Sequence, residues 1–213
     1  MVKLHNRKIT AGLMLCMTVF AGCSAAKLPD VIENTSLSID KTGTVTFYEV
    51  DVFDKEYYDL DEMEKLGREL AAAYNTEHQT GENAPVVLEE IAEVPGNSGY
   101  VMATYSYDSA RTYQTYHERT LFYGTVEQAI NDGWDFEALN KVLFNAKGDK
   151  TIVSSAIKDM SKKHVILLEE QTRVYCPYKV AYISEDARLL EDGSVDTSGV
   201  YEEEYPVIIV LDK

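Results

Sequence analysis

The side chains that most often carry out chemistry are few and widely spaced in this sequence. Beyond residue 23 there is one cysteine, Cys176, and three histidines, His78, His117 and His164. Cys176 alternates with Val174 in a strand-like stretch, which favours a buried, inert thiol, because a nucleophilic thiolate needs a base beside it. The sequence contains no Gly-x-Ser-x-Gly elbow, no His-Glu-x-x-His helix and no phosphate loop ending in Gly-Lys-Ser/Thr. We therefore expect surface histidines, no catalytic residues and no cofactor.

One acidic segment near the C-terminus has the spacing of a calcium-binding loop. The side chains at the equivalents of loop positions 1, 3, 5, 7 and 12 are Asp192, Ser194, Asp196, Ser198 and Glu203. The sixth position is Thr197, whereas the sharp turn of a calcium loop requires Gly there. The segment is therefore interpreted as an ordinary hairpin loop, and Asp192, Ser194, Asp196 and Glu203 remain weak metal-ligand candidates for a test.

Tyrosine is crowded into residues 100–123. Exposed tyrosines could stack on sugar rings or form a protein interface, since each offers a large contact area at low entropic cost. Tyrosine is also a good strand former whose hydroxyl tolerates a half-buried position, so packing explains the same pattern. The residues kept as candidates for binding are Tyr105, Tyr107, Tyr113 and Tyr116.

The N-terminus has the three parts of a secretion signal. Lys3, Arg7 and Lys8 precede an uncharged apolar run from Ile9 to Ala21. This run is shorter than the roughly 20 residues that a membrane-spanning helix needs, but it suits the apolar centre of a signal peptide.

Cys23 follows this signal directly after two small residues, Ala21 and Gly22. The segment resembles the lipobox of bacterial lipoproteins, with Phe20 where Leu is commonest. It predicts cleavage before Cys23 and acylation of that thiol with lipid such as palmitate. Two acyl chains bury on the order of 30 methylenes at about 0.8 kcal/mol each, enough for a lasting membrane anchor. The alternative is an ordinary secretory signal cut near residues 25–26, with Cys23 incidental.

The charge of the chain excludes one class of partner. Residues 1–22 carry three of the 20 basic residues and none of the 36 acidic ones, which leaves residues 23–213 with a formal charge of −19. Counterion release cannot drive such a polyanion onto nucleic acid. The same charge disfavours electrostatic docking to an anionic membrane, so we expect lipid on Cys23 to make the membrane contact.

Hydrophobic periodicity predicts the elements of a single α+β domain over residues 37–213. Apolar residues recur at helical spacing from about 59 to 78, which predicts one long amphipathic helix that begins at Asp59. Its apolar face carries Leu60, Met63, Leu66, Leu70 and Tyr74. Hairpins are expected at 37–53, with a turn at Asp40–Gly43, and at 86–107. One or two short helices are expected, at 109–117 with Ser109 as cap and at 125–132 with Thr125 and Gln128 as capping pair. Several strands are expected after residue 160. The expected fold is α+β with a mainly antiparallel sheet. Residues 23–36 form a lipidated tether, and 145–149 is the candidate subdomain boundary.

Three short segments resemble a known group of proteins. They are Tyr57–Glu62, Leu121–Ala129 and Val180–Glu185, and they look like uncharacterised lipoproteins common in clostridial gut bacteria. The resemblance runs at intervals over most of residues 37–190. It implies a Gram-positive cell envelope and a role that is unknown, and it carries over no site residues.

The sequence thus predicts a lipid-anchored protein on the outer face of the cell membrane. The function we expect is non-enzymatic binding of an envelope protein or a small ligand. Two alternatives stay open. One is a carboxylate-based hydrolase acting on envelope glycans, for which two carboxyl groups about 5–10 Å apart in an open cleft would be needed. The other is a structural or assembly role with the tyrosine-rich stretch as interface, for which exposed tyrosines would be needed.

Overall fold

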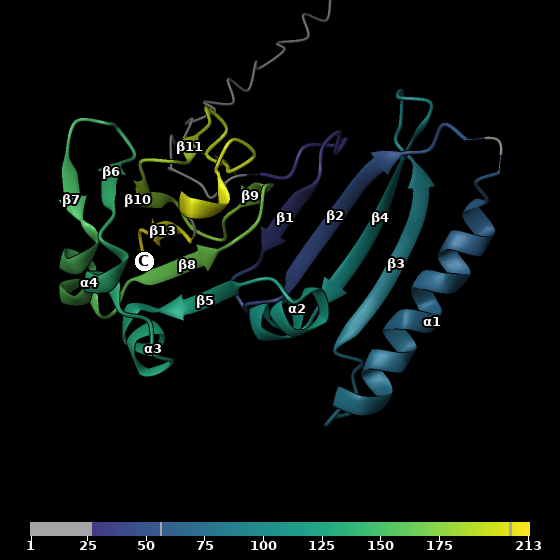
Figure 1. Ribbon diagram of the computed structural model, residues 1–213, viewed down its shortest axis with the longest axis horizontal. Coiled ribbons are helices and arrows are strands. Elements are labelled where there is room, and N and C mark those ends of the chain that lie inside the picture. The colour runs from purple at the N-terminus through teal and green to yellow at the C-terminus, as the bar shows by residue number, and fades with distance from the viewer. Residues whose placement is uncertain (1–26, 56, 205) are drawn as a thin grey trace, which may run out of the picture.

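The computed structural model describes residues 27–213 except 56 and 205, and most of this part of the chain belongs to two β-sheets (Figure 1). Sheet A contains, in spatial order, β11 (Arg188–Leu189), β12 (Val195–Asp196), β9 (Arg173–Tyr175), β1 (Ser36–Ile39), β2 (Val45–Val52), β4 (Tyr100–Tyr107) and β3 (Val86–Glu93). Sheet B contains β5 (Leu121–Thr125), β8 (His164–Leu168), β13 (Val207–Leu211), β10 (Val180–Ser184), β6 (Val142–Asn145) and β7 (Thr151–Val153).

Strand pairing is antiparallel at every described junction except one. β1 pairs in parallel with β9, with Leu37 opposite Val174. This single pairing joins the N-terminal hairpin β1–β2 to strands more than 130 residues later in the chain. Sheet A is therefore assembled from both ends of the described sequence.

Sheet B is buried on both faces because its central strands are apolar without interruption. On β8, Ile166 and Leu168 point into a core shared with sheet A, while Val165 and Leu167 point into a second core. The second core is covered by α3 (Val126–Asn131), α4 (Phe136–Leu139) and the 3-10 helix η1 (Ser154–Met160). β13 is fully buried along its length in the same way, as a continuous apolar run predicts.

Helix α1 (Leu60–His78) flanks the outer strand of sheet A, at the far right of Figure 1. Asp59 is its N-cap, because the carboxylate accepts hydrogen bonds from the backbone N–H groups of Asp61 and Glu62. The fully buried residues of the helix are small, Gly67 and Ala71. A Cβ placed on Gly67 would lie 2.8 Å from both Leu88 Cδ2 and Tyr105 Oη, so glycine allows the helix to approach the sheet closely.

The structure corrects the predicted fold class. The expectation of an α+β domain, with a mainly antiparallel sheet, one long amphipathic helix and one or two short helices, is wrong, because two sheets with thirteen strands among the described residues make up the body. The helix forms at the predicted position, but its predicted apolar face enters the core only in part: Tyr74 packs against the core, whereas Leu66 and Leu70 are 57% and 54% exposed. Three- and four-residue spacing identifies residues that share a helix face, but it does not show which face the sheet will cover.

Helix α2 (Ala110–His117) lies between the two sheets and connects β4 of sheet A to β5 of sheet B (Figure 1). A short 3-10 helix, η2 (Glu202–Glu204), precedes β13. Of the predicted tether, Ile32 is already buried and Ser36 begins β1. The turn at 145–149 lies between β6 and β7 of one sheet.

Candidate functional site

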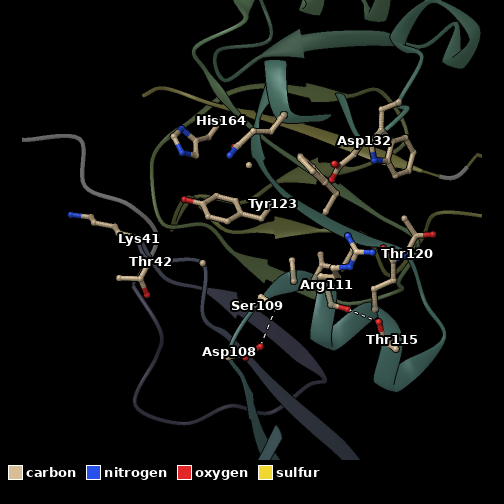
Figure 2. A pocket seen from close by; sticks show the side chains of 18 residues that line it. Lys41, Thr42, Asp108, Ser109, Arg111, Thr115, Thr120, Tyr123, Asp132 and His164 are labelled. Carbon is tan, nitrogen blue, oxygen red and sulfur yellow. Dashed lines mark hydrogen bonds between the residues drawn. The ribbon is translucent and has the colours of Figure 1, made fainter. Parts of the chain in front are cut away.

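A polar cleft of about 750 Å³ opens where the two sheets meet. Its walls come from three parts of the chain that are distant in sequence: the β1–β2 turn at 41–43, the stretch 108–134 that contains α2, β5 and α3, and His164 at the start of β8. Figure 2 shows Lys41, Tyr123 and His164 towards one side of the cleft, and Arg111, Thr120 and Asp132 towards the other. A volume of this size lies within the range of about 300–1,000 Å³ that is usual for small-ligand sites.

The β1–β2 turn is held rigidly by the side chain of Asp40. Its Oδ1 accepts hydrogen bonds from the backbone N–H groups of Thr42 and Thr44 and from the hydroxyl of Thr42. Gly43 closes the turn at a φ of +94°, a conformation that favours glycine. The turn therefore presents Lys41 and Thr42 to the cleft from a fixed position.

The start of α2 forms the second wall, and its polar groups are already paired with one another. Ser109 is the N-cap and accepts a hydrogen bond from the N–H of Thr112 at 3.2 Å. Asp108 Oδ1 accepts from the hydroxyls of Ser109 at 3.1 Å and Thr112 at 2.5 Å. The carboxylate of Asp108 thus stabilises the helix start, as expected of an acidic group beside a helix N-terminus.

The third wall is strand β5 and the helix that follows it. Thr125 and Gln128 form a reciprocal capping box, in which Gln128 Oε1 accepts from Thr125 N at 2.8 Å and Thr125 Oγ1 accepts from Gln128 N at 3.1 Å. Gly124 makes this tight arrangement fit, because a Cβ there would lie 2.9 Å from Gln128 Oε1 and from Phe122 Cζ. The structure therefore confirms the capping pair that the sequence predicts at Thr125 and Gln128.

The charges that line the cleft balance. Lys41 and Arg111 oppose Asp108 and Asp132. Burial, assisted by the positive charge of Lys213, lowers the pKa of His164, so its imidazole is neutral at physiological pH. Burial raises the pKa of Tyr123 to about 12, so its phenol stays protonated. The net charge of the cleft lining is therefore close to zero, although the chain as a whole is strongly acidic.

His164 also contributes an unsatisfied polar atom. Its Nδ1 is buried and has no hydrogen-bond partner within the described part of the chain. A buried polar atom without a partner is costly, and such atoms are often satisfied by a ligand or by water. The ring lies 5.5 Å from that of Tyr123, centroid to centroid, at the same side of the cleft.

Three of the four tyrosines predicted as binding candidates lie inside the molecule, away from solvent. Tyr105, Tyr107 and Tyr113 are 9%, 1% and 1% exposed, and Tyr116 is half-buried. The rings of Tyr107 and Tyr113 meet edge to face at 5.2 Å, and Tyr105 and Tyr107 stack at 6.3 Å. These contacts hold α2 against sheet A, so the crowding of tyrosine reflects packing, and the rings of Tyr105, Tyr107 and Tyr113 are not accessible to a ligand.

The acidic residues with calcium-loop spacing are not brought together around one point. Asp192 accepts hydrogen bonds from Ser194 and pairs with Arg173 at 2.7 Å, while Asp196, on β12, accepts from Ser198 and pairs with Arg188 at 2.5 Å. Among residues 27–213, leaving aside 56 and 205, no group of three His, Cys, Asp or Glu side chains is placed to hold a metal ion.

Cys176 and the other histidines have structural surroundings. Cys176 is buried, and burial raises the pKa of its thiol to about 12, which suppresses the reactive thiolate. His117 bonds to Tyr107, and the ring of His78 stacks on that of Tyr74 at 4.0 Å. Cys23, the predicted lipidation site, lies outside the described residues.

The residues of the cleft were not identified from sequence. The sequence predicts a turn at Asp40–Gly43, a cap at Ser109 and a capping pair at Thr125 and Gln128, but nothing in the spacing of these segments shows that they meet. His164 was assigned to the surface, whereas it is half-buried at the cleft. Only the topology of the two sheets brings these segments together.

Comparison of the chain with protein-family models, with curated proteins and with solved structures finds no match in any of the three. In the described portion of the chain, no helix combines the length and the apolar character needed to cross a bilayer.

Proposed function

We propose that this protein is a lipid-anchored binding module on the outer face of a bacterial cell membrane, and that its ligand occupies the cleft between α2 and β5. The single observation that carries the binding role is the cleft itself. Side chains from both sheets converge on a concave, charge-balanced space, and one of the lining residues, His164, has a buried nitrogen, Nδ1, without a hydrogen-bond partner in the described chain. Such convergence of a few polar groups is what distinguishes ligand sites from ordinary surface hollows.

The lining favours a polar ligand that carries no large net charge. The side-chain amides of Gln114 and Gln128 offer N–H donors, and the hydroxyl oxygens of Thr42, Thr115 and Thr120, whose hydrogens bond within the protein, offer acceptors. Aromatic rings, from Phe122, Tyr123 and Trp134, offer apolar faces beside them. The acidic chain around the site repels anionic ligands at a distance, while Lys41 and Arg111 keep the cleft itself from being acidic.

Binding without catalysis is supported by the state of the acidic residues in the cleft. The cleft is lined by two carboxylates, Asp108 and Asp132. Asp108 is engaged by the hydroxyls of Ser109 and Thr112, so it is committed to the helix start. A glycan hydrolase needs one carboxyl group as acid and a second as nucleophile or base. Asp132 alone would have to supply both roles.

Binding can be tested with two sets of probes, soluble glycan fragments from bacterial cell wall and a mixture of random-sequence decapeptides. We expect saturation-transfer NMR to detect binding to the mature chain from one set without turnover in mass spectra. Gln114→Trp, on the cleft wall, should abolish binding, whereas Asp159→Trp, at an exposed position of η1, should not. Failure of both probe sets, or equal effects of the two variants, would overturn the proposal. Hydrolysis lost in Asp132→Asn would establish the enzyme instead.

The anchor is a separate part of the proposal and rests on residues 1–23. Its supports are the basic start, the short apolar run, and the small residues before Cys23. Mass spectrometry of the protein from cells should find an acylated N-terminal Cys23, and Cys23→Ser should move the protein from the membrane fraction to the medium. Retention of residues 1–22, or an unmodified residue 23, would contradict anchoring and leave the cleft proposal untouched.

A further inference from the structure

Two charged side chains that line the cleft, those of Arg111 and Asp132, have no partner among the described residues. Within this part of the chain, the guanidinium of Arg111 and the carboxylate of Asp132 form no hydrogen bond and no ion pair, either with each other or with another group. They come from separate elements, the first turn of α2 and the end of α3. Figure 2 shows both on the same side of the cleft.

Arg111 differs in this respect from the other arginines. The chain contains six arginines, of which Arg7 lies outside the described residues. Three of the others form ion pairs with carboxylates, namely Arg68, Arg173 and Arg188. Arg119 lies near Glu170, where burial raises the pKa of the carboxyl group and the charge of Arg119 opposes that rise. Arg111 is therefore the described arginine without an acidic partner, although the chain has 36 acidic residues.

Neither charge stabilises the helix on which it lies. A helix favours acidic groups at its N-terminus and basic groups at its C-terminus. Arg111 lies in the first turn of α2, which contains no acidic residue, and Asp132 is the C-cap of α3. Both signs are the reverse of those that the helix dipoles favour. The fold therefore gives no reason for these two charges, and their place in the cleft indicates a role in binding.

We propose that Arg111 and Asp132 together bind the zwitterionic end of a peptide, whose last residue carries both a free carboxylate and an ammonium group, as a C-terminal lysine does. This inference rests on the binding role proposed for the cleft. The guanidinium of Arg111 offers two parallel N–H donors that match a carboxylate, and Asp132 accepts hydrogen bonds from the ammonium. Such an end has no net charge, so the acidic chain around the cleft does not repel it.

The surroundings of the two charges fit this ligand. Arg111 and Asp132 do not pair with each other, so the carboxylate and the ammonium of one lysine residue, which a flexible stem separates, can reach both at once. Trp134 also lines the cleft and offers a ring face to the methylenes of that stem. The side of the cleft with Lys41 and Tyr123 leaves space for the preceding residues of the peptide (Figure 2).

The experiment uses three decapeptides with the same Gly-Ser sequence and an acetylated N-terminus, which differ only at the last residue. The first ends in lysine with a free carboxylate, the second in lysine amide, and the third in norleucine with a free carboxylate. Binding to the mature chain is measured by calorimetry and by the fluorescence of Trp134, the single tryptophan. We expect the amide and the norleucine peptide each to bind about tenfold more weakly than the first, because each lacks one charge-assisted contact.

Two variants assign each charge of the peptide to its partner. Arg111→Gln should bind the lysine acid and the lysine amide equally while still preferring lysine to norleucine. Asp132→Asn should show the opposite pattern. Arg119→Gln is the matched control, because Arg119 is also exposed but does not line the cleft, and this variant should bind all three peptides as the wild type does. All three positions are exposed, so the substitutions leave the packing of the domain unchanged.

Two results would overturn the assignment of the zwitterionic end. They are equal affinities of the wild type for the three peptides, and discrimination between acid and amide that persists in Arg111→Gln. If none of the three peptides binds while Gln114→Trp still abolishes binding of a glycan probe, the cleft is a binding site and only the peptide end is wrong. If no probe of either kind binds, this inference and the proposed function fail together.

Discussion

His117 should make the stability of the domain depend on pH in a way that a single substitution removes. Its Nε2 lies 2.6 Å from the hydroxyl of Tyr107, and its ring packs against Tyr113 at 4.5 Å and Phe47 at 5.2 Å. Burial, assisted by the positive charge of Arg119, lowers the pKa of His117 from 6.5 to about 4. The folded protein therefore holds this imidazole in its neutral form.

The direction of the effect follows from proton linkage. Between pH 6.5 and about 4 the unfolded chain binds a proton at His117 and the folded chain does not. Lowering the pH through this interval thus favours unfolding, and the stability that neutral burial preserves above pH 6.5 is lost as the pH falls. Over the interval from pH 7 to pH 5 the two pKa values imply a loss of about 2 kcal/mol from this group.

Urea unfolding followed by the fluorescence of Trp134 would measure the effect in wild type and His117→Gln. The expected result is a fall in unfolding free energy from pH 7 to pH 5 that is smaller by about 2 kcal/mol in the variant. Tyr107→Phe is the control: it removes one hydrogen bond, costing about 1 kcal/mol at pH 7, but it should keep the pH dependence because burial is the main cause. Equal pH dependence in wild type and His117→Gln would refute the reasoning.

Three further predictions concern the interior. Lys141 Nζ bonds to the carboxylate of Asp186, and their side chains are 13% and 5% exposed. Lys141→Met should lower the unfolding free energy measured in urea by about 3–5 kcal/mol, because it leaves the buried carboxylate unpaired. A Lys141→Met, Asp186→Leu double variant that is no more stable than the single one would contradict this. Gly67→Ala should lower the unfolding free energy by about 1–3 kcal/mol in the same assay, because the added Cβ would lie only 2.8 Å from Tyr105 Oη. Unchanged stability would show that α1 can move outward. Cys176 should react with a maleimide only after denaturation, since it is buried; rapid labelling of the native protein would disprove that placement.

Local signals in the sequence predicted local structure well. The cap at Asp59, the capping box at Thr125–Gln128 and the hairpin around residues 95–99 depend on contacts between near neighbours, and the structure contains each of them. Hydrophobic periodicity was less reliable for predicting which residues are buried. Leu66 and Leu70 recur at helical spacing yet face solvent, because the helix is positioned by Gly67 and by polar contacts of Arg68 and Asn75 with the strand edge.

The long-range parts of the fold, and with them the cleft, could not be predicted from the sequence. Neither the pairing of β1 with β9 nor the edge position of β5 leaves a signal in the residues of those strands. The cleft needs Thr42, Ser109, Tyr123 and His164 to meet, and no spacing rule connects them. Cys23 is the opposite case, a prediction from contiguous residues that only chemistry on the cellular protein can test.

The parallel pairing of β1 with β9 affects how the protein folds. Thr35 O accepts hydrogen bonds from Thr172 Oγ1 and from the N–H of Arg173. Residues near position 36 must therefore pair with residues near position 173 before sheet A is complete. Closing so large a loop makes the contact order high, and proteins dominated by such contacts fold slowly. During that delay the apolar strands of both sheets remain unpaired and prone to aggregate. We therefore expect this protein to depend on molecular chaperones when it folds in the cell. Overproduction without additional chaperones should yield inclusion bodies.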